Sequence, residues 1–221
     1  MWLILAFVSA CLLGFYDVFK KKSLKNNAVV PVLFLNTMFS SLIFLPFIIA
    51  SANGNISESS LFYTHTYGWE AHKYILLKSC IVLSSWLFGY FGIKHLPLTI
   101  VGPINATRPV MVLIGALTFF GERLSLFQWL GVITAMFSLF MLSQSGKKEG
   151  IDFKHNKWIV FVLTSNILGA LSGLYDKFLM ASPAAGGVGL DKMAVQSWYN
   201  IYQFFMMGIM MLILWMPTRK K

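Results

Sequence analysis

The sequence predicts an all-α membrane protein, a polytopic bundle of helices that crosses the bilayer several times. Hydrophobic residues make up 57% of the chain and charged residues only 12%, whereas soluble domains carry about 25% charged residues. The apolar residues form continuous runs of about 20 residues, the length that crosses a hydrocarbon core. Because apolar and polar residues do not alternate within these runs, the runs indicate helices and not barrel strands.

Seven apolar runs each predict one transmembrane helix. They cover residues 2–19, 29–51, 74–93, 97–120, 125–144, 157–181 and 193–216. The protein is therefore expected to be a multi-pass membrane protein surrounded by the lipid bilayer. We assign it to the inner (plasma) membrane. The formal net charge of +10 is interpreted as anchoring to lipid headgroups and control of topology, so nucleic acid is not expected as a partner.

Basic residues are unequally divided between the two sides of the predicted bundle. Segments after even-numbered helices hold four of them: Lys73, Arg123, Lys177 and Lys192. Segments after odd-numbered helices hold twelve: Lys20, Lys21, Lys22, Lys25, Lys94, Lys147, Lys148, Lys154, Lys157, Arg219, Lys220 and Lys221. By the positive-inside rule, the side with twelve is cytoplasmic and the amino terminus lies outside.

The chain contains an internal repeat. Residues 12–19 (LLGFYDVF) return 159 positions later as residues 171–178 (LSGLYDKF), and residues 34–36 (FLN) correspond to residues 198–200 (WYN). Duplicated membrane segments are typical of secondary transporters, whose two related halves rock around a site between them. We expect a first five-helix repeat over residues 1–146, a linker over 147–156, and the first two helices of a second, inverted repeat over 157–221.

A more specific pattern lies between residues 97 and 144. A predicted helix carries Pro109-Val110 near its middle and ends in Gly121-Glu122-Arg123, and the next helix has Gln128 and Gly131 near its start. This arrangement resembles the drug/metabolite transporter superfamily, EamA type. The resemblance implies ten helices in two halves of opposite orientation and the transport of a small solute. It also implies that both termini are cytoplasmic, against the charge count, which we favour.

The residues of this pattern also have structural interpretations. A tight turn at Gly121 and Glu122, with Ser125 as a helix cap, would let the two helices pack as an antiparallel hairpin. Gly131 would allow a close approach between helices. Since the second repeat holds only two helices, the chain is expected to be incomplete as a transporter. A second copy or a partner chain would then complete the second repeat.

Arg108, between Pro103 and Pro109, is the basic residue that we expect deep inside a span. A central arginine costs from about 2.5 to more than 10 kcal/mol, so it should face a cavity or a partner. Pro109 removes a backbone donor and should widen or kink the helix at the same depth. Two interpretations stay open. Arg108 either anchors a carboxylate or phosphate of a solute or belongs to a structural ion pair.

Two acidic residues, Asp17 and Asp176, adjoin the predicted helix cores, and each follows a tyrosine, Tyr16 or Tyr175. One interpretation is a pair of salt bridges with nearby lysines at the helix ends, closing one mouth of the bundle. The other is a proton or cation site within the membrane. These four residues are therefore the candidates for gating or ion coupling.

A set of polar residues within the predicted spans is expected to line a central cavity together with Arg108. The candidate binding or cavity-lining residues are Asn36, Trp86, Asn105, Asn166, Asn200 and Gln203, with Ser84, Ser85 and Tyr202 as further members. An amide in a span needs hydrogen-bond partners. For each single residue the alternative is therefore a hydrogen bond that joins two helices.

Other classes of function find no support in the sequence. The chain has no phosphate-binding loop, nucleophile elbow or paired catalytic carboxylates, so neither an enzyme nor a nucleotide-driven pump is expected. His65, Glu70 and His72 lack regular metal-ligand spacing, and no metal or cofactor is expected. Cys11 and Cys80 lie in apolar runs and do not indicate a disulfide.

These observations predict a secondary transporter, or a fragment of one, that moves a small organic solute across the membrane by alternating access. The alternative is a membrane scaffold that transports nothing, or an inactive truncated membrane protein.

Overall fold

The computed structural model describes residues 2–119, 121, 123–146 and 156–217, and the described part is helical without a strand. The helices are α1 (Trp2–Leu24), α2 (Val29–Ala52), α3 (Trp69–His95), α4 (Leu98–Asn105), α5 (Arg108–Phe119), α6 (Leu126–Gly146), α7 (Lys157–Met180) and α8 (Lys192–Met210). A short 3₁₀ turn, η2 (Pro183–Ala185), precedes α8, and a π-helical turn, η3 (Met211–Trp215), continues it. The predicted all-α bundle is confirmed.

Five segments are long and apolar enough to cross a membrane. They are Val29–Ala52, Trp69–His95, Leu98–Phe119, Lys157–Met180 and Lys192–Trp215. Helices α1 and α6 stand where the two remaining spans were predicted. Because a bilayer of fixed thickness sets the length of an apolar helix, the positions of the spans could be read from the length of the runs.

The predicted helix over residues 97–120 is broken into α4 and α5 by a turn at Ala106 and Thr107. Proline at position 109 has no backbone N–H, so the carbonyl of Asn105 loses its helical donor. The Thr107 hydroxyl donates to the carbonyl of Ile104 at 2.7 Å, which satisfies part of the broken turn. The structure therefore shows a discontinuous helix at the place where the sequence predicted a kink.

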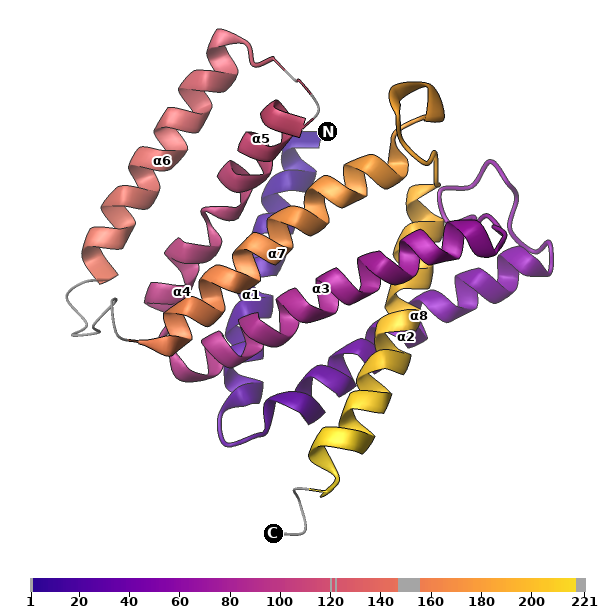
Figure 1. Ribbon diagram of the computed structural model, residues 1–221, viewed down its shortest axis with the longest axis horizontal. Coiled ribbons are helices and arrows are strands. Elements are labelled where there is room, and N and C mark those ends of the chain that lie inside the picture. The colour runs from indigo at the N-terminus through magenta and orange to yellow at the C-terminus, as the bar shows by residue number, and fades with distance from the viewer. Residues whose placement is uncertain (1, 120, 122, 147–155, 218–221) are drawn as a thin grey trace.

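Helices α3 and α7 form the most extensive contact of the bundle, and α2 packs against α8 (Figure 1). Glycines make the α3–α7 contact close. A Cβ atom on Gly89 would lie 2.8 Å from the Ser165 hydroxyl, and one on Gly92 would overlap Val162. Small residues commonly bring membrane helices together, because lipid provides no hydrophobic driving force for their association.

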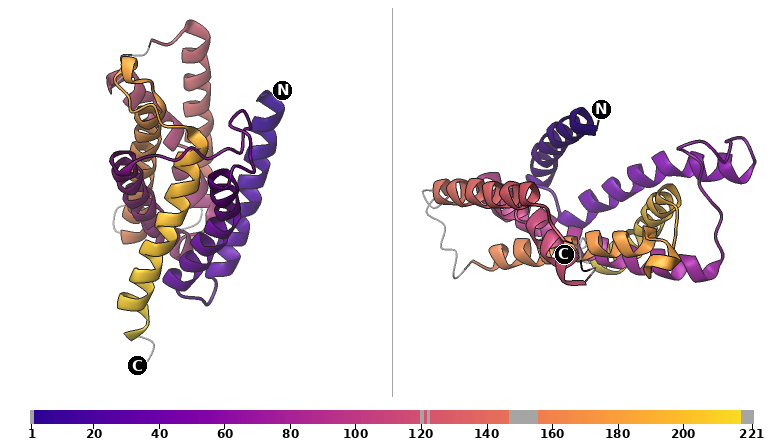
Figure 2. Two further views of the ribbon diagram at one scale, coloured as in Figure 1. Left: turned by 90° about the vertical axis from the view of Figure 1, so that its right-hand side faces the viewer. Right: turned by 90° about the horizontal axis from the view of Figure 1, so that it is seen from above.

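Helix α1 stands at the edge of the bundle (Figure 2). Large apolar side chains along its first two turns and beyond, such as Ile4, Phe7 and Leu12, are more than half exposed. Its carboxyl-terminal end is fixed instead. Leu24 is buried, and the Lys21 ammonium donates to the carbonyls of residues 93, 94 and 96 at 2.5, 3.2 and 2.7 Å. Lys21 thus caps the end of α3.

Candidate functional site

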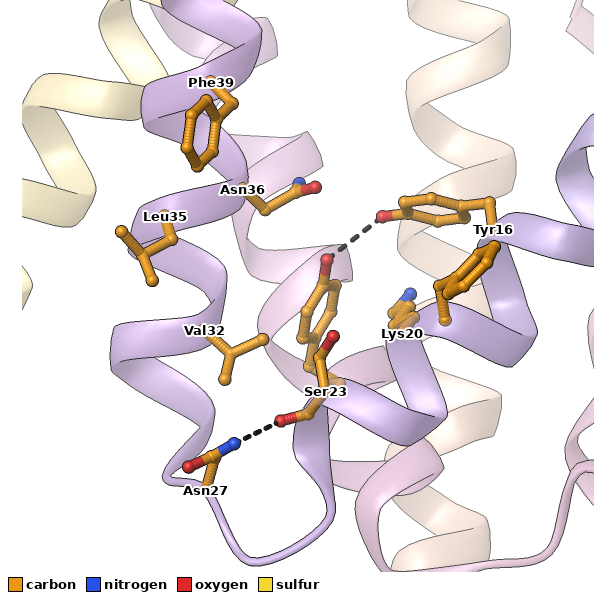
Figure 3. A pocket seen from close by; sticks show the side chains of 10 residues that line it. Tyr16, Lys20, Ser23, Asn27, Val32, Leu35, Asn36 and Phe39 are labelled. Carbon is orange, nitrogen blue, oxygen red and sulfur yellow. Dashed lines mark hydrogen bonds between the residues drawn. The ribbon is translucent and has the colours of Figure 1, made fainter.

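A cavity of about 550 Å³ lies among α1, α2, α3, α7 and the broken helix α4–α5, and we call it the central cavity. It is lined by Leu13, Tyr16, Asp17, Lys20, Asn36, Ser40, Trp86, Gly89, Ile93, Asn105, Arg108, Pro109 and Ser165. A neighbouring cavity of about 470 Å³ between α1, α2 and α3 shares Tyr16, Lys20 and Asn36 with it (Figure 3). Both volumes fall in the range of small-molecule sites, roughly 300–1,000 Å³.

The break between α4 and α5 brings Arg108 into the cavity wall as the first residue of α5. Asn166 of α7 holds the two half-helices together. Its side-chain oxygen accepts a hydrogen bond of 3.2 Å from Arg108 Nη2, and its Nδ2 donates to the carbonyl of Ile104 at 2.8 Å. Asn166 is fully buried, so these bonds satisfy an amide that would otherwise be costly inside the bundle.

Gly169, one turn further along α7, leaves room for the Arg108 guanidinium because it has no side chain. A Cβ atom there would lie 2.7 Å from both Nε and Cζ of Arg108, so the guanidinium fits only against bare backbone. The Nε atom is buried and has no hydrogen-bond partner. Among the described residues, the two ion pairs are Lys73–Glu70 and Lys78–Asp176, and neither includes Arg108.

One face of α1 supplies the opposite wall. Leu13, Tyr16, Asp17 and Lys20 are spaced so that they share this face. The hydroxyls of Tyr16 and Tyr90 are 3.0 Å apart and join α1 to α3. The Lys20 ammonium lies 4.1 Å from the centre of the Tyr90 ring and 5.4 Å from that of Tyr16. These are cation–π distances.

The position of Lys20 corrects its assignment to a headgroup-anchoring loop. The apolar run was taken to end at residue 19, but α1 continues to Leu24, so Lys20 lies within the helix and lines the cavity. The spacing of three residues between Asp17 and Lys20 had suggested a salt bridge on one helical face. The described residues show no such ion pair, and the Lys20 ammonium lies near the Tyr16 and Tyr90 rings instead.

The second copy of the Tyr-Asp motif has a different setting. Asp176 forms an ion pair with Lys78 of α3, not with the adjacent Lys177 that the sequence pointed to. The Lys78 ammonium also lies 4.5 Å from the centre of the Tyr199 ring of α8, and the Tyr175 hydroxyl donates to the carbonyl of Tyr74 at 3.3 Å. This copy therefore fastens α7 to α3.

Lys78 is a basic residue inside a span that the sequence reading overlooked when it singled out Arg108. It lies in the predicted run 74–93, and its side chain is 7% exposed. The signal was present, because a lysine between apolar residues at this depth requires a partner. An aspartate on another helix was available at Asp176.

The predicted cavity-lining residues separate into two groups. Asn36, Trp86, Asn105 and Arg108 line the central cavity. Asn166, Asn200 and Gln203 are buried but are not among its lining residues. Asn166 positions Arg108, Asn200 donates to the carbonyl of residue 196 within α8 at 2.7 Å, and both polar atoms of the Gln203 amide are unpartnered.

The turn before α6 contains a reciprocal cap. The backbone N–H of Ser125 donates to Gln128 Oε1 at 2.8 Å, and that of Gln128 donates to the Ser125 hydroxyl at 3.4 Å, which is a capping box. Gly121 has a φ of +62°, as a tight turn requires. Glu122 lies outside the described residues. A Cβ atom on Gly131 would meet nothing within 4 Å, so the close helix approach expected at this glycine is not seen.

The described residues contain no cluster of histidine, cysteine and acidic side chains that could hold a metal ion. His72 has a structural setting instead, since its Nδ1 lies 2.8 Å from the Tyr202 hydroxyl and its ring meets Trp198 edge-on. Cys11 and Cys80 are free thiols.

The fold and the cavity define a multi-pass α-helical membrane protein with charged side chains around an internal space. Residues 1–144 match the EamA-like transporter family, and the chain belongs to this family. The match spans α1 to α6 almost completely. No curated protein and no solved structure matches the chain.

Proposed function

We propose that this protein is a secondary transporter that moves a small organic solute across the plasma membrane by alternating access, with the central cavity as the solute site. The observation that carries the proposal is the cavity itself. It has about 550 Å³ of space, and its wall contains the break of a transmembrane helix. Discontinuous helices next to charged side chains are typical of transporter binding sites.

Three lining residues and one hydrogen bond around the cavity support roles in binding and gating. Asn36, Trp86 and Asn105 offer polar and aromatic surface to a solute. The Tyr16–Tyr90 hydrogen bond joins α1 to α3 and would have to break when α1 moves away from the bundle. We assign this pair to the gate. Membership of the EamA-like family supports transport as the function.

The ion pair of Lys78 and Asp176 lies apart from the central cavity, because neither residue lines it. We propose that it keeps α3 and α7 together while α1 moves. Asp17, in contrast, faces the cavity and is the better candidate for a proton or cation site that couples transport to an ion gradient.

The test begins with binding. The purified full chain is screened for thermal stabilisation by a library of metabolites, because a ligand at a hundred times its dissociation constant adds about 2.7 kcal/mol to stability. Solutes that stabilise the protein are then offered in radiolabelled form to proteoliposomes. We expect uptake that saturates with solute concentration and that requires the protein.

Arg108→Ala provides the matched variant for this assay, and Lys25→Ala, an exposed lysine near the end of α1, is its control. We expect Arg108→Ala to abolish uptake while the protein still elutes as a folded species, and Lys25→Ala to transport normally. Folded protein that neither binds nor moves any solute would refute the proposed function and support the scaffold alternative.

A further inference from the structure

The central cavity has an unbalanced charge. Two cationic side chains, Lys20 and Arg108, and one carboxylate, Asp17, are its charged lining residues. Asp17 attracts both cations, and the two cations repel one another. The other intramembrane cation, Lys78, is already paired with Asp176. Since an isolated charge is expensive inside a membrane, one positive charge of the cavity lacks a counter-charge.

Arg108 has hydrogen-bond donors to spare. Its guanidinium carries five N–H groups. One on Nη2 is engaged by Asn166 and the one on Nε is buried, which leaves both N–H groups of Nη1 and the second of Nη2 without a partner among the described residues. Gly169 and Asn166 fix the guanidinium plane. A fixed guanidinium with free donors matches the paired oxygens of a carboxylate or phosphate.

Lys20 also has hydrogen-bond donors available for a ligand, but aromatic rings hold its ammonium in place. Its ammonium lies near the Tyr16 and Tyr90 rings and forms neither a hydrogen bond nor an ion pair with any described residue. The two rings stabilise the positive charge without using its N–H donors. The ammonium is therefore held beside the cavity with its donors available to a ligand.

We propose that the transported solute carries an acidic group, a carboxylate or a phosphate, which Lys20 and Arg108 bind together from opposite walls of the central cavity. This inference rests on the proposed function and adds the chemical class of the solute. The uncharged part of the solute would lie against Trp86, Asn36 and Ser40. Asp17 limits the net positive charge, which allows the anion to leave again.

The experiment uses the purified full chain in nanodiscs of phosphatidylcholine and two matched pairs of probes. Hexanoate is compared with hexanamide, and glycerol 3-phosphate with glycerol, by thermal stabilisation at constant ionic strength. We expect the acid of at least one pair to stabilise the protein and its neutral partner to have no effect. Lys20→Met and Arg108→Gln should each weaken binding of the acid by about tenfold or more, as the loss of a charged hydrogen bond does. Lys25→Met, which removes an exposed charge from the same end of the chain, should not.

Asp17→Asn should change the affinity for the acid in the opposite direction. Removing the carboxylate takes a repulsive charge away from the anion, so this variant should bind the acid more tightly than the parent protein does. Weaker binding by Asp17→Asn would contradict the inference, because the Asp17 carboxylate would then be contributing to ligand binding instead of opposing it.

The remaining outcomes separate this inference from the proposed function. Stabilisation and uptake of neutral solutes only would overturn the acidic class and leave transport intact. Stabilisation by phosphatidylglycerol in the disc, dependent on Lys20 and Arg108, without any effect of soluble acids would assign the site to a lipid headgroup and overturn the inference. Acid binding without uptake would support the site and count against transport.

Discussion

Asn166 of α7 contacts both halves of a broken helix at once, accepting a hydrogen bond from Arg108 of α5 and donating one to the carbonyl of Ile104 in α4. The amide is buried, and the carbonyl of Ile104 also accepts from Thr107. One side chain therefore sets the relative position of two half-helices and the direction of an intramembrane charge.

Replacement of Asn166 by alanine should destabilise the protein and remove the hydrogen bond that holds the Arg108 side chain in place. Loss of two hydrogen bonds and exposure of unsatisfied buried groups predict a loss of about 1–3 kcal/mol in the free energy of unfolding. Thermal and denaturant unfolding in detergent measure the change. Asn27→Ala is the control, because the Asn27 amide makes one exposed bond to the carbonyl of Ser23. Equal effects of the two variants would show that Asn166 has no special structural role.

The ion pair of Lys78 and Asp176 should contribute less to the free energy of unfolding than is lost when only one of its two charges is removed. Each single variant, Lys78→Met or Asp176→Asn, leaves a charge without its partner inside the membrane. Fully buried pairs lose about 3–5 kcal/mol in this way, and the partial exposure of Asp176 should reduce the loss to about 2 kcal/mol. The double variant should recover most of this stability.

A double-mutant cycle measures the coupling of this pair directly. If the two single losses simply add in the double variant, the side chains do not interact in the folded protein. The pair would then not serve as a fastening between α3 and α7.

Gly92 and Gly131 should respond in opposite ways to the same change. Alanine at Gly92 would overlap Val162, and the shift needed to accommodate it should cost about 1–3 kcal/mol. Alanine at Gly131 meets nothing within 4 Å and should be neutral, or stabilise α6 by up to about 1 kcal/mol through helix propensity. Unfolding of the two variants under the same conditions is the measurement. A tolerated Gly92→Ala would contradict the close α3–α7 contact.

Membrane orientation should follow the charge count. Lys20 lines the cavity and Lys21 binds carbonyls of α3, so neither is free to meet headgroups. Without them the imbalance is still ten to four, and we expect the α1–α2 turn to be cytoplasmic. Reporters inserted after Asn26 and after Gly186 should report the cytoplasm and the outside, respectively. The reverse pattern would favour the orientation that the family resemblance implied.

The sequence could predict those features of the fold that depend on the residues of a single helix. Bilayer thickness fixes the length of apolar runs, so helices appear where the seven runs were found, with the run over residues 97–120 divided into α4 and α5. Proline chemistry located the weak point before Pro109, although a full break was not foreseen. Lys20 was missed because a hydropathy run ends at the first charges, whereas a helix can continue beyond them, as α1 does to Leu24.

Relations between helices were less accessible to the sequence. The sequence shows that Asn200 and Gln203 are polar residues within a predicted span, but it does not show which helix they contact. Both are buried away from the lining of the central cavity. The pairing of Asp176 with Lys78 joins residues 98 positions apart, and only the packing of α3 on α7 brings them together.

The two copies of the Tyr-Asp motif differ in what a substitution would change first. Asp176 is bound into the contact of α3 with α7, so a substitution there is exposed first as a loss of folded protein. Asp17 stands on α1, which has few neighbours in the bundle, so a substitution there leaves the folded bundle largely intact and changes the charge that a ligand meets. Asp17 is therefore a position where the charge that a ligand meets can change at little cost in stability, whereas Asp176 is not. New solute preferences should therefore arise by changes on α1 before they arise on α7.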